Sequence, residues 1–210
     1  MVLLRASGSN RLRGRSHTRS RGREGVTVSQ RSATGTHGSG GQPPTSDAPD
    51  TEIVLAPLDS QARGPAETIL RTTGVFREDE ILVALEVLDS FFAHPGQDYT
   101  AVGAFTPGGE LLGFTVVGPT PCTLGTWDLY WIAVSLEAQG LGVGTVLLKE
   151  VEGRLTQSNA RLLIIETSSR PPYDPTRAFY LKRGYREVAR VPDFYEAGDD
   201  RVIYAKTFTV

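Results

Sequence analysis

Cysteine and histidine are scarce in this sequence of 210 residues. Its single cysteine, Cys122, can form neither an intrachain disulfide nor a cysteine metal cluster, so we expect a reducing compartment, the cytoplasm. Two of the three histidines, His17 and His37, lie in a segment that is not expected to fold, which leaves only His94 for a folded site. A histidine metal site or a Ser-His-Asp triad is therefore hard to build, and we expect no metal.

Long apolar runs and a strong net charge are missing as well. The longest apolar run, over 129–134, has the length of a strand, whereas a membrane helix needs roughly 18–20 apolar residues. The formal net charge is −2, so no global positive field attracts nucleic acid. We therefore expect no membrane partner and disfavour nucleic acid.

The first 46 residues lack what a folded core needs. They contain one acidic residue, Glu24, and no Phe, Trp or Tyr, and Arg, Ser, Gly and Thr dominate. Such a segment cannot bury enough apolar area to offset its ordering entropy, so we predict a disordered tail and linker over 1–50 and one folded domain over 51–210. Three interpretations of the tail stay open: an extension from a start codon set too early, a cleaved transit peptide, and a nucleic-acid tether.

Hydrophobic periodicity in the rest of the chain predicts a mixed, mostly antiparallel α/β sheet with flanking helices and one βαβ unit. Strands are expected over 53–58, 99–105, 111–118, 129–134, 162–166, 185–191 and 201–208. Helices are expected over 66–76, 145–155 and 176–183, and over the stretch "REDEILVALEVLDSFFAHPG". The apolar stripe of that stretch comprises Ile81, Leu82, Leu85, Leu88 and Phe92.

Three glycines at every second position separate the strand over 129–134 from the helix that follows it: Gly140, Gly142 and Gly144. A helix N-terminus has unpaired N–H groups and a partial positive charge, and glycines let a ligand approach that backbone. Together these features predict an anion cradle, with phosphate as the expected ligand. A tight strand-to-helix turn without any ligand explains the same glycines equally well.

Two familiar phosphate motifs do not fit this stretch. The P-loop needs Gly, four residues and then Gly-Lys-Ser/Thr, and the sequence contains no such run. The dinucleotide fingerprint fails because its third glycine position holds Thr145 or Leu147. Glu166 ends the next strand, about where a ribose-binding acid would lie, so a nucleotide site stays open as the weaker interpretation.

Two segments carry a resemblance to a known family. The run from Gln139 to Gly144 resembles the Gln/Arg-x-x-Gly-x-Gly/Ala signature of the GNAT superfamily of N-acetyltransferases. The stretch "TRAFYLKRGY" is similar to a helix of that family that reads Ala-x-x-x-Tyr-x-x-x-Gly-Phe/Tyr, with Tyr180, Gly184 and Tyr185 matching and Thr176 in place of the Ala. The closing stretch "VPDFYEAGDDRVIYAK" also looks like the family, so the resemblance covers residue 52 to the C-terminus.

The resemblance implies a binding site for acetyl-coenzyme A as co-substrate. Loop amides would hold its pyrophosphate, and the pantetheine arm would lie between two splayed strands. The implied pyrophosphate loop comprises Gln139, Gly140, Leu141, Gly142, Val143, Gly144 and Thr145. The implied pantetheine-pairing backbone comprises Ile132, Ala133 and Val134.

The resemblance and the chemistry of acetyl transfer also assign roles to side chains. Asp128, eleven residues before Gln139, matches a catalytic Glu of some members and is the expected base that deprotonates the amine. Glu166 is the competing acid, or it binds the amine, or it holds a loop. Tyr180 is the expected general acid that protonates the leaving thiolate. Strand alternation places Tyr130 with Asp128 on one face, lining the acceptor pocket, and Trp131 on the other.

The sequence departs from the family at the start of the Tyr180 helix. Many members have an Asn there that bonds the pantetheine arm, whereas this chain reads "PPYDPTR". A binding module that holds an acyl-coenzyme A or a nucleotide without turnover is the alternative to an enzyme. The amine acceptor, whether small molecule or peptide or protein, and a homodimer both stay open.

Overall fold

The computed structural model describes residues 26–28, for the backbone alone, and residues 52–208. Its strands are β1 (Val26–Val28), β2 (Ile53–Pro57), β3 (Thr100–Phe105), β4 (Leu111–Pro119), β5 (Thr126–Val134), β6 (Leu162–Ser168), β7 (Arg186–Glu196) and β8 (Asp199–Thr207). Its α-helices are α1 (Arg63–Thr72), α2 (Glu78–Ala93), α3 (Val143–Gln157) and α4 (Asp174–Leu181), with short 3-10 turns η1 (Ser60–Ala62), η2 (Leu136–Ala138) and η3 (Pro171–Tyr173).

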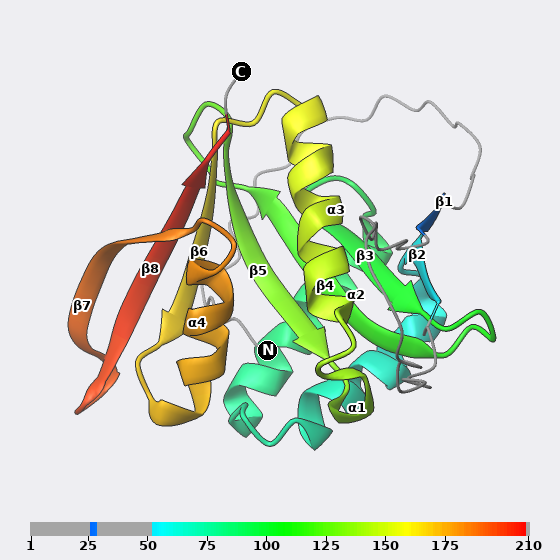
Figure 1. The fold of residues 1–210 in the computed structure, drawn as a ribbon, viewed down its shortest axis with the longest axis horizontal. Coiled ribbons are helices and arrows are strands. Elements are labelled where there is room, and N and C mark those ends of the chain that lie inside the picture. Colours follow the sequence, from blue (N-terminus) through cyan, green and yellow to red (C-terminus); the bar gives the residue numbers. More distant parts are fainter. Residues whose placement is uncertain (1–25, 29–51, 209–210) are drawn as a thin grey trace, which may run out of the picture.

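The strands form one sheet in the order β1-β2-β3-β4-β5-β6-β8-β7. Neighbouring strands are antiparallel except β5 and β6, which are parallel and are joined through α3. Figure 1 shows α3 and α4 in front of the sheet, with α1 and α2 behind it. The mixed, mostly antiparallel sheet with a single βαβ unit confirms the fold class that the sequence predicts.

Two hydrophobic clusters, one on each face, hold these layers together. One combines α3 with the side of β5 and β6 that carries Leu129 and Ile165, and it includes Tyr180 of α4. The other packs α1 and α2 against Phe114 and Trp131, both fully buried. Each cluster removes apolar side chains from water, which stabilises the layered arrangement by about 25 cal/mol per Å² of buried apolar surface.

Pairing along β5 contains a bulge that the sequence does not reveal. Val116 of β4 pairs with Trp131, whereas Val117 pairs with Leu129, so Tyr130 is an extra residue in β5. As a result Tyr130 and Trp131 lie in the same cluster, on the face of α1 and α2. The expectation that these two rings face opposite sides is wrong, because a bulge shifts the alternation by one residue.

Other differences from the predicted elements are local. Leu82 of α2 is 52% exposed, and Phe91, rather than Phe92, is buried against the sheet. The closing strands run almost to the turn between them, so most of 192–200, which lies between the two predicted strands, belongs to β7 and β8. Backbone pairing of β1 with β2 gives residues 26–28 a structure that their sequence does not predict; the rest of the predicted tail lies outside the described residues.

None of the helices described in 52–208 combines the length and the apolar character that crossing a membrane requires.

Candidate active site

Strands β5 and β6 separate partway along their length. Their pairing runs from Thr126↔Leu162 to Leu129↔Ile165 and stops there, although β5 continues to Val134 and β6 to Ser168. Beyond this point β5 is paired with β4 alone, and β6 with β8 alone. Buried backbone groups need a hydrogen-bond partner, so the opening between the two strands can accept an extended ligand that pairs like a strand.

The resemblance places Ile132, Ala133 and Val134 along this opening, and the structure puts them on the part of β5 that pairs with β4 but no longer with β6. All three residues are at most 3% exposed. Their backbone edge toward β6 therefore lies in a desolvated environment, where a hydrogen bond to a ligand is stronger than in water.

The glycine turn leads directly from this opening into α3. Gly140 and Gly142 have φ values of 83° and 85°, in the left-handed region that favours glycine, and Gly142 is the N-cap of α3. A Cβ added at either position would meet no atom of the described residues within 4 Å. Backbone conformation, not crowding by the protein, therefore requires glycine here, and the space beside both residues is open to a ligand.

The first turn of α3 presents amides that have no backbone partner. Thr145 and Val146 donate to the carbonyl of Gly142, at 2.9 and 3.1 Å. In the described part of the chain, no backbone hydrogen bond is donated by the amides of Gly140, Gly142, Val143 and Gly144. Unpaired amides at the positive end of a helix fit a phosphate group, so the residues present suit the diphosphate that the resemblance implies.

Tyr180 lies in the core on the same side of the sheet as α3. Its ring is fully buried and contacts the rings of Phe179, Tyr185 and Tyr204, with centroids 5.4, 5.7 and 6.0 Å away. Its hydroxyl has no hydrogen-bond partner among the described residues. Burial raises the pKa of Tyr180 above the ordinary tyrosine value, so the phenol is protonated at neutral pH.

The two candidate carboxylates share one face of the sheet. Leu129 and Ile165 belong to the α3-side cluster, so Asp128 and Glu166, their neighbours in the strands, point to the opposite side. Asp128 is 3% exposed and accepts a hydrogen bond of 2.7 Å from the hydroxyl of Thr120. Glu166 lies just past the last residue of β6 that pairs with β5, and it forms an ion pair with Arg201.

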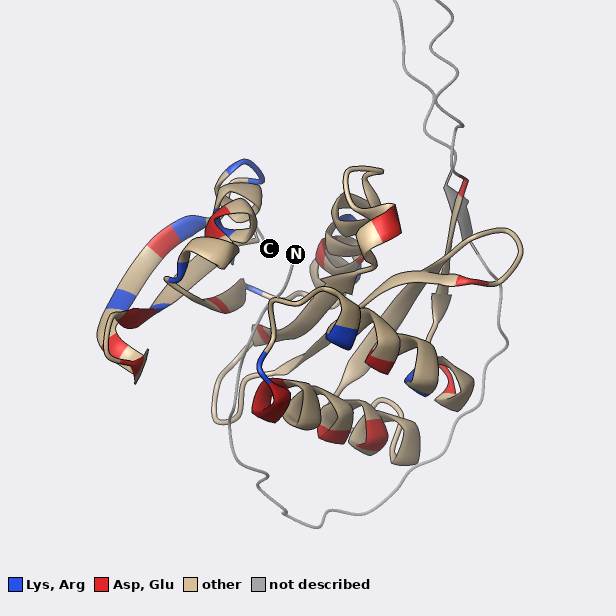
Figure 2. Ribbon diagram, turned by 90° about the horizontal axis from the view of Figure 1, so that it is seen from below, with Lys and Arg blue, Asp and Glu red and all other residues tan. Residues whose placement is uncertain are grey.

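The acids of the closing hairpin are structural. Asp199 is 2% exposed and accepts hydrogen bonds from the Ser168 hydroxyl at 2.6 Å and the Ser169 amide at 3.0 Å. Asp200 binds Arg190 at 3.1 Å. Figure 2 shows acidic and basic positions interspersed along β7 and β8. The Asp199 carboxylate fastens the hairpin to the end of β6, and the Asp200 carboxylate links β8 to β7.

Arginines at this end of the sheet are not identified by the sequence. Arg170 lies 3.3 Å from Asp199, and Arg201 pairs with Glu166. Arg177, on the first turn of α4, donates to the carbonyl of Ser168 at 2.6 Å. Arg177 thus ties α4 to β6 near the position where the resemblance implies an Asn. No sequence motif signals these roles, because the partners are far apart along the chain.

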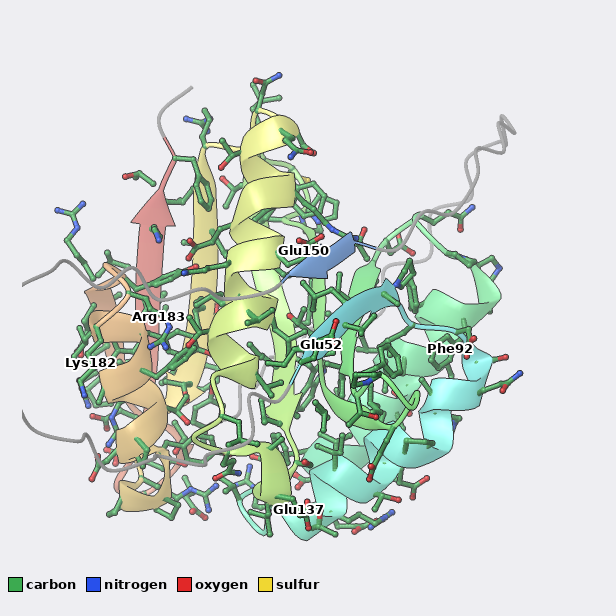
Figure 3. The ribbon with its side chains drawn as sticks, turned by 45° about the vertical axis from the view of Figure 1, so that its right-hand side comes forward. Glu52, Phe92, Glu137, Glu150, Lys182 and Arg183 are labelled. Carbon is green, nitrogen blue, oxygen red and sulfur yellow. The ribbon has the colours of Figure 1, made fainter. Side chains whose placement is uncertain are left out.

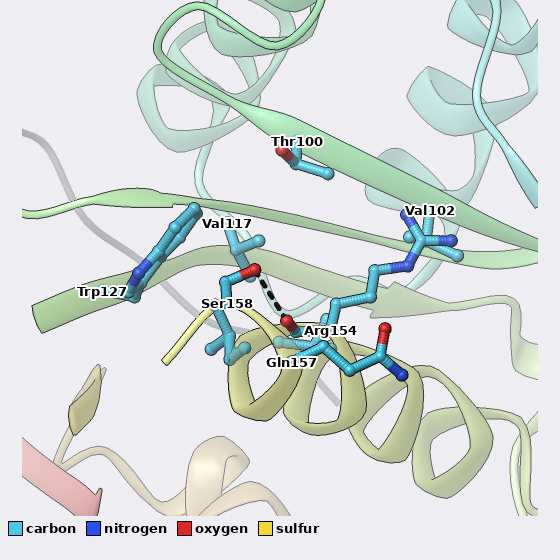
Figure 4. A pocket seen from close by; sticks show the side chains of 9 residues that line it. Thr100, Val102, Val117, Trp127, Arg154, Gln157 and Ser158 are labelled. Carbon is cyan, nitrogen blue, oxygen red and sulfur yellow. Dashed lines mark hydrogen bonds between the residues drawn. The ribbon is translucent and has the colours of Figure 1, made fainter. Parts of the chain in front are cut away.

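A cavity of about 280 Å³ lies away from this site, beside the C-terminal half of α3. Figure 4 shows Trp127, Thr100 and Val117 on one side of it, with Arg154 of α3 and Ser158, the C-cap of α3, on the other. Its lining includes none of the site residues predicted from the sequence. Within 52–208, no cluster of three His, Cys, Asp or Glu side chains has an arrangement that could hold a metal ion.

A splayed strand pair beside a glycine-started helix is an arrangement that suits an extended, anionic ligand. The model of the acetyltransferase (GNAT) family matches residues 69–185, more than half of the chain. The chain belongs to this family, as the two motifs predict.

Similarity to individual proteins agrees with that placement. An uncharacterized N-acetyltransferase of Methanocaldococcus jannaschii is 34% identical over 83 residues, which are 39% of this chain and 52% of that protein. The chain thus spans about half the length of this curated relative. The crystal structure of a candidate GNAT acetyltransferase from Desulfovibrio desulfuricans matches with a TM-score of 0.71 and 36% identity, covering 74% of this chain and 98% of that one.

A more distant structure shares the fold alone. It is an aminoglycoside 6′-N-acetyltransferase complexed with coenzyme A, with a TM-score of 0.59 and 18% identity, covering 74% of this chain and 97% of that one.

Replacing Gly142 with alanine tests the conformation of the cradle. Gly142→Ala should lower the free energy of unfolding by about 1–2 kcal/mol, because a Cβ is disfavoured at positive φ. Gly153, inside α3 and also free of neighbours within 4 Å, is the matched control, and Gly153→Ala should raise the free energy of unfolding by about 0.5–1 kcal/mol. Urea denaturation measures both values, and equal effects at the two positions would contradict the left-handed N-cap.

Proposed function

We propose that the protein is an N-acetyltransferase that moves the acetyl group of acetyl-coenzyme A to a primary amine. The observation that carries this proposal is the opening between β5 and β6, which leads straight to the unpaired amides at the start of α3. Family membership supports acetyl transfer, and the coenzyme A complex of the aminoglycoside 6′-N-acetyltransferase supports coenzyme A as the carrier.

We propose that the coenzyme binds to backbone groups at the opening between β5 and β6 and at the start of α3. The amides between Gln139 and Thr145 hold the diphosphate, and the edge of β5 over 132–134 pairs with the pantetheine arm. The coenzyme supplies the acetyl group as a thioester. Fixing that group relative to the amine removes part of the entropic barrier, an effect worth about 7–11 kcal/mol in well-oriented systems.

An amine must lose its proton before it can attack. Alkylammonium groups have pKa values of about 10, so a carboxylate at the site is needed to accept the proton at neutral pH. We assign this role to Asp128, acting through a water because the side chain is short. Glu166, held by Arg201 next to the opening, binds the ammonium form, and Tyr130, on the same face as Asp128, lines the acceptor pocket.

Tyr180 is proposed to return a proton to the leaving sulfur. Its hydroxyl is buried, protonated and without a partner among the described residues, so its proton is available to a ligand. A buried hydroxyl without a partner costs about 1–3 kcal/mol, a cost that a bound sulfur acceptor would offset.

The alternative is a module that binds an acyl-coenzyme A without turnover. Small-molecule, peptide and protein amines all fit the same chemistry, and likeness to the aminoglycoside enzyme, which shows the fold alone, does not choose among them. The protein is proposed to act in the cytoplasm.

Release of free thiol from acetyl-coenzyme A tests the enzyme proposal. The full-length protein is incubated with acetyl-coenzyme A and a panel of small amines, amino acids and peptides, and a thiol reagent follows coenzyme A release. We expect at least one amine to raise the rate well above that without amine, with acetylated product seen by mass spectrometry. Binding of acetyl-coenzyme A with no amine-dependent release would favour the binding module.

A pair of tyrosine variants tests the general acid. Tyr180→Phe should lower kcat about 100-fold or more and leave the free energy of unfolding unchanged or higher, because it removes an unpartnered buried hydroxyl. Tyr185 is the control, since its hydroxyl donates to Glu152 at 2.9 Å. Tyr185→Phe should lower the free energy of unfolding by about 1 kcal/mol and spare kcat. Normal turnover by Tyr180→Phe would remove it from the mechanism.

Steady-state kinetics of variants distinguish the roles proposed for Asp128 and Glu166. Asp128→Asn should lower kcat about 100- to 10,000-fold and abolish the fall of activity at acidic pH that a general base produces. Glu166→Gln should mainly raise KM for the amine, because it removes a binding charge. Steady-state pH profiles of both variants provide the comparison, and the reverse pattern would move the base role to Glu166.

A further inference from the structure

Arg183 occupies the space between α4 and α3. Figure 3 shows its side chain on the α3 side of α4, whereas Lys182 points to the outer side. Its Nη2 donates to the hydroxyl of Thr145, and its Nη1 donates to the carbonyl of Phe179 at 3.0 Å. Its guanidinium carbon lies 3.4 Å from the centroid of the Phe179 ring. The guanidinium is therefore held in one place beside the first turn of α3.

This cation lacks the carboxylate partner that comparable side chains have. In the described ranges no Asp or Glu oxygen lies within 4.0 Å of Arg183, whereas neighbouring Lys206 binds Glu152 at 2.8 Å and Arg154 binds Glu150 at 2.7 Å. The Nε of Arg183 is buried without a hydrogen-bond partner. Burial lowers the pKa of Arg183, so the charged form is partly desolvated without full compensation.

The position of the guanidinium at the start of α3 makes its positive charge still less favourable without an anion. Thr145 is the third residue of α3, next to the unpaired amides of Gly142, Val143 and Gly144. A positive side chain is disfavoured at the positive end of a helix, where an anion is favoured. Arg183 and these amides therefore form a single region that a negatively charged group would stabilise.

We propose that Arg183 is a binding residue for the diphosphate of the coenzyme, which it grips together with the amides of the glycine turn. The inference rests on the proposed coenzyme and adds a side chain that neither the glycine motif nor the tyrosine motif includes. The Thr145 hydroxyl and the Phe179 ring hold the guanidinium beside the cradle in the free protein. Its fork of N–H donors matches phosphate oxygens in geometry.

Ligand affinities of matched variants test the proposal. Isothermal titration calorimetry on the full chain measures Kd for coenzyme A and for 3′-dephospho-coenzyme A, which share the diphosphate and differ in the 3′-phosphate. Arg183→Gln should weaken both ligands by about 10- to 100-fold, the effect of losing a hydrogen bond to a charged group. Arg183→Lys should fall between Arg183→Gln and the wild type, because a lysine keeps the charge without the fork.

Lys182→Gln removes the same charge one residue away, at an exposed position. It should change either Kd by about twofold at most. Circular dichroism of each free variant checks its folding, and Arg183→Lys carries the test if Arg183→Gln does not fold.

Each result decides a separate point. Unchanged affinity of the Arg183 variants for both ligands would overturn the inference. A loss confined to coenzyme A would place Arg183 at the 3′-phosphate and also overturn the diphosphate assignment. If the wild-type protein binds neither ligand, the proposed function itself fails, and the inference fails with it.

Discussion

The separation of β5 from β6 is the constraint on which the rest of the site depends. The bulge at Tyr130 changes the direction of β5 just after its last residue paired with β6, and bulges bend and twist a strand in this way. On the other side of the opening, β6 stays paired with β8 up to Ser168, so β6 cannot bend together with β5. Buried backbone edges are thereby left facing each other without pairing, which a folded protein tolerates only where water or a ligand supplies the missing partners.

The start of α3 adds a charge requirement at the end of that opening. Left-handed glycines turn the chain from β5 into the helix, and the turn leaves amides directed outward at the positive end of the helix. Arg183 brings a further positive charge to the same turn. A ligand that offers strand-like hydrogen-bonding groups at one end and a negative charge at the other satisfies both demands. That combination of properties connects the architecture to acyl transfer from a phosphate-bearing carrier.

Local sequence signals predict the elements and the glycine turn but not the contacts between distant segments. Apolar spacing identifies α2 and α3, and three alternating glycines mark the start of α3. The bulge at Tyr130 is not predictable in this way, because it depends on the register between β4 and β5. Sequence reasoning does not single out Arg177, or Arg183 over Lys182, for a similar reason: each is an ordinary helix cation in sequence, and only a partner on another element distinguishes it.

Backbone amide chemical shifts recorded while coenzyme A is added test the central claim most directly. The account predicts that the largest shifts occur at Gly140, Gly142, Val143 and Gly144 and along 132–134, where amides of the turn and of the strand edge gain partners. Shifts confined to another surface, such as the cavity beside the C-terminal half of α3, would contradict it.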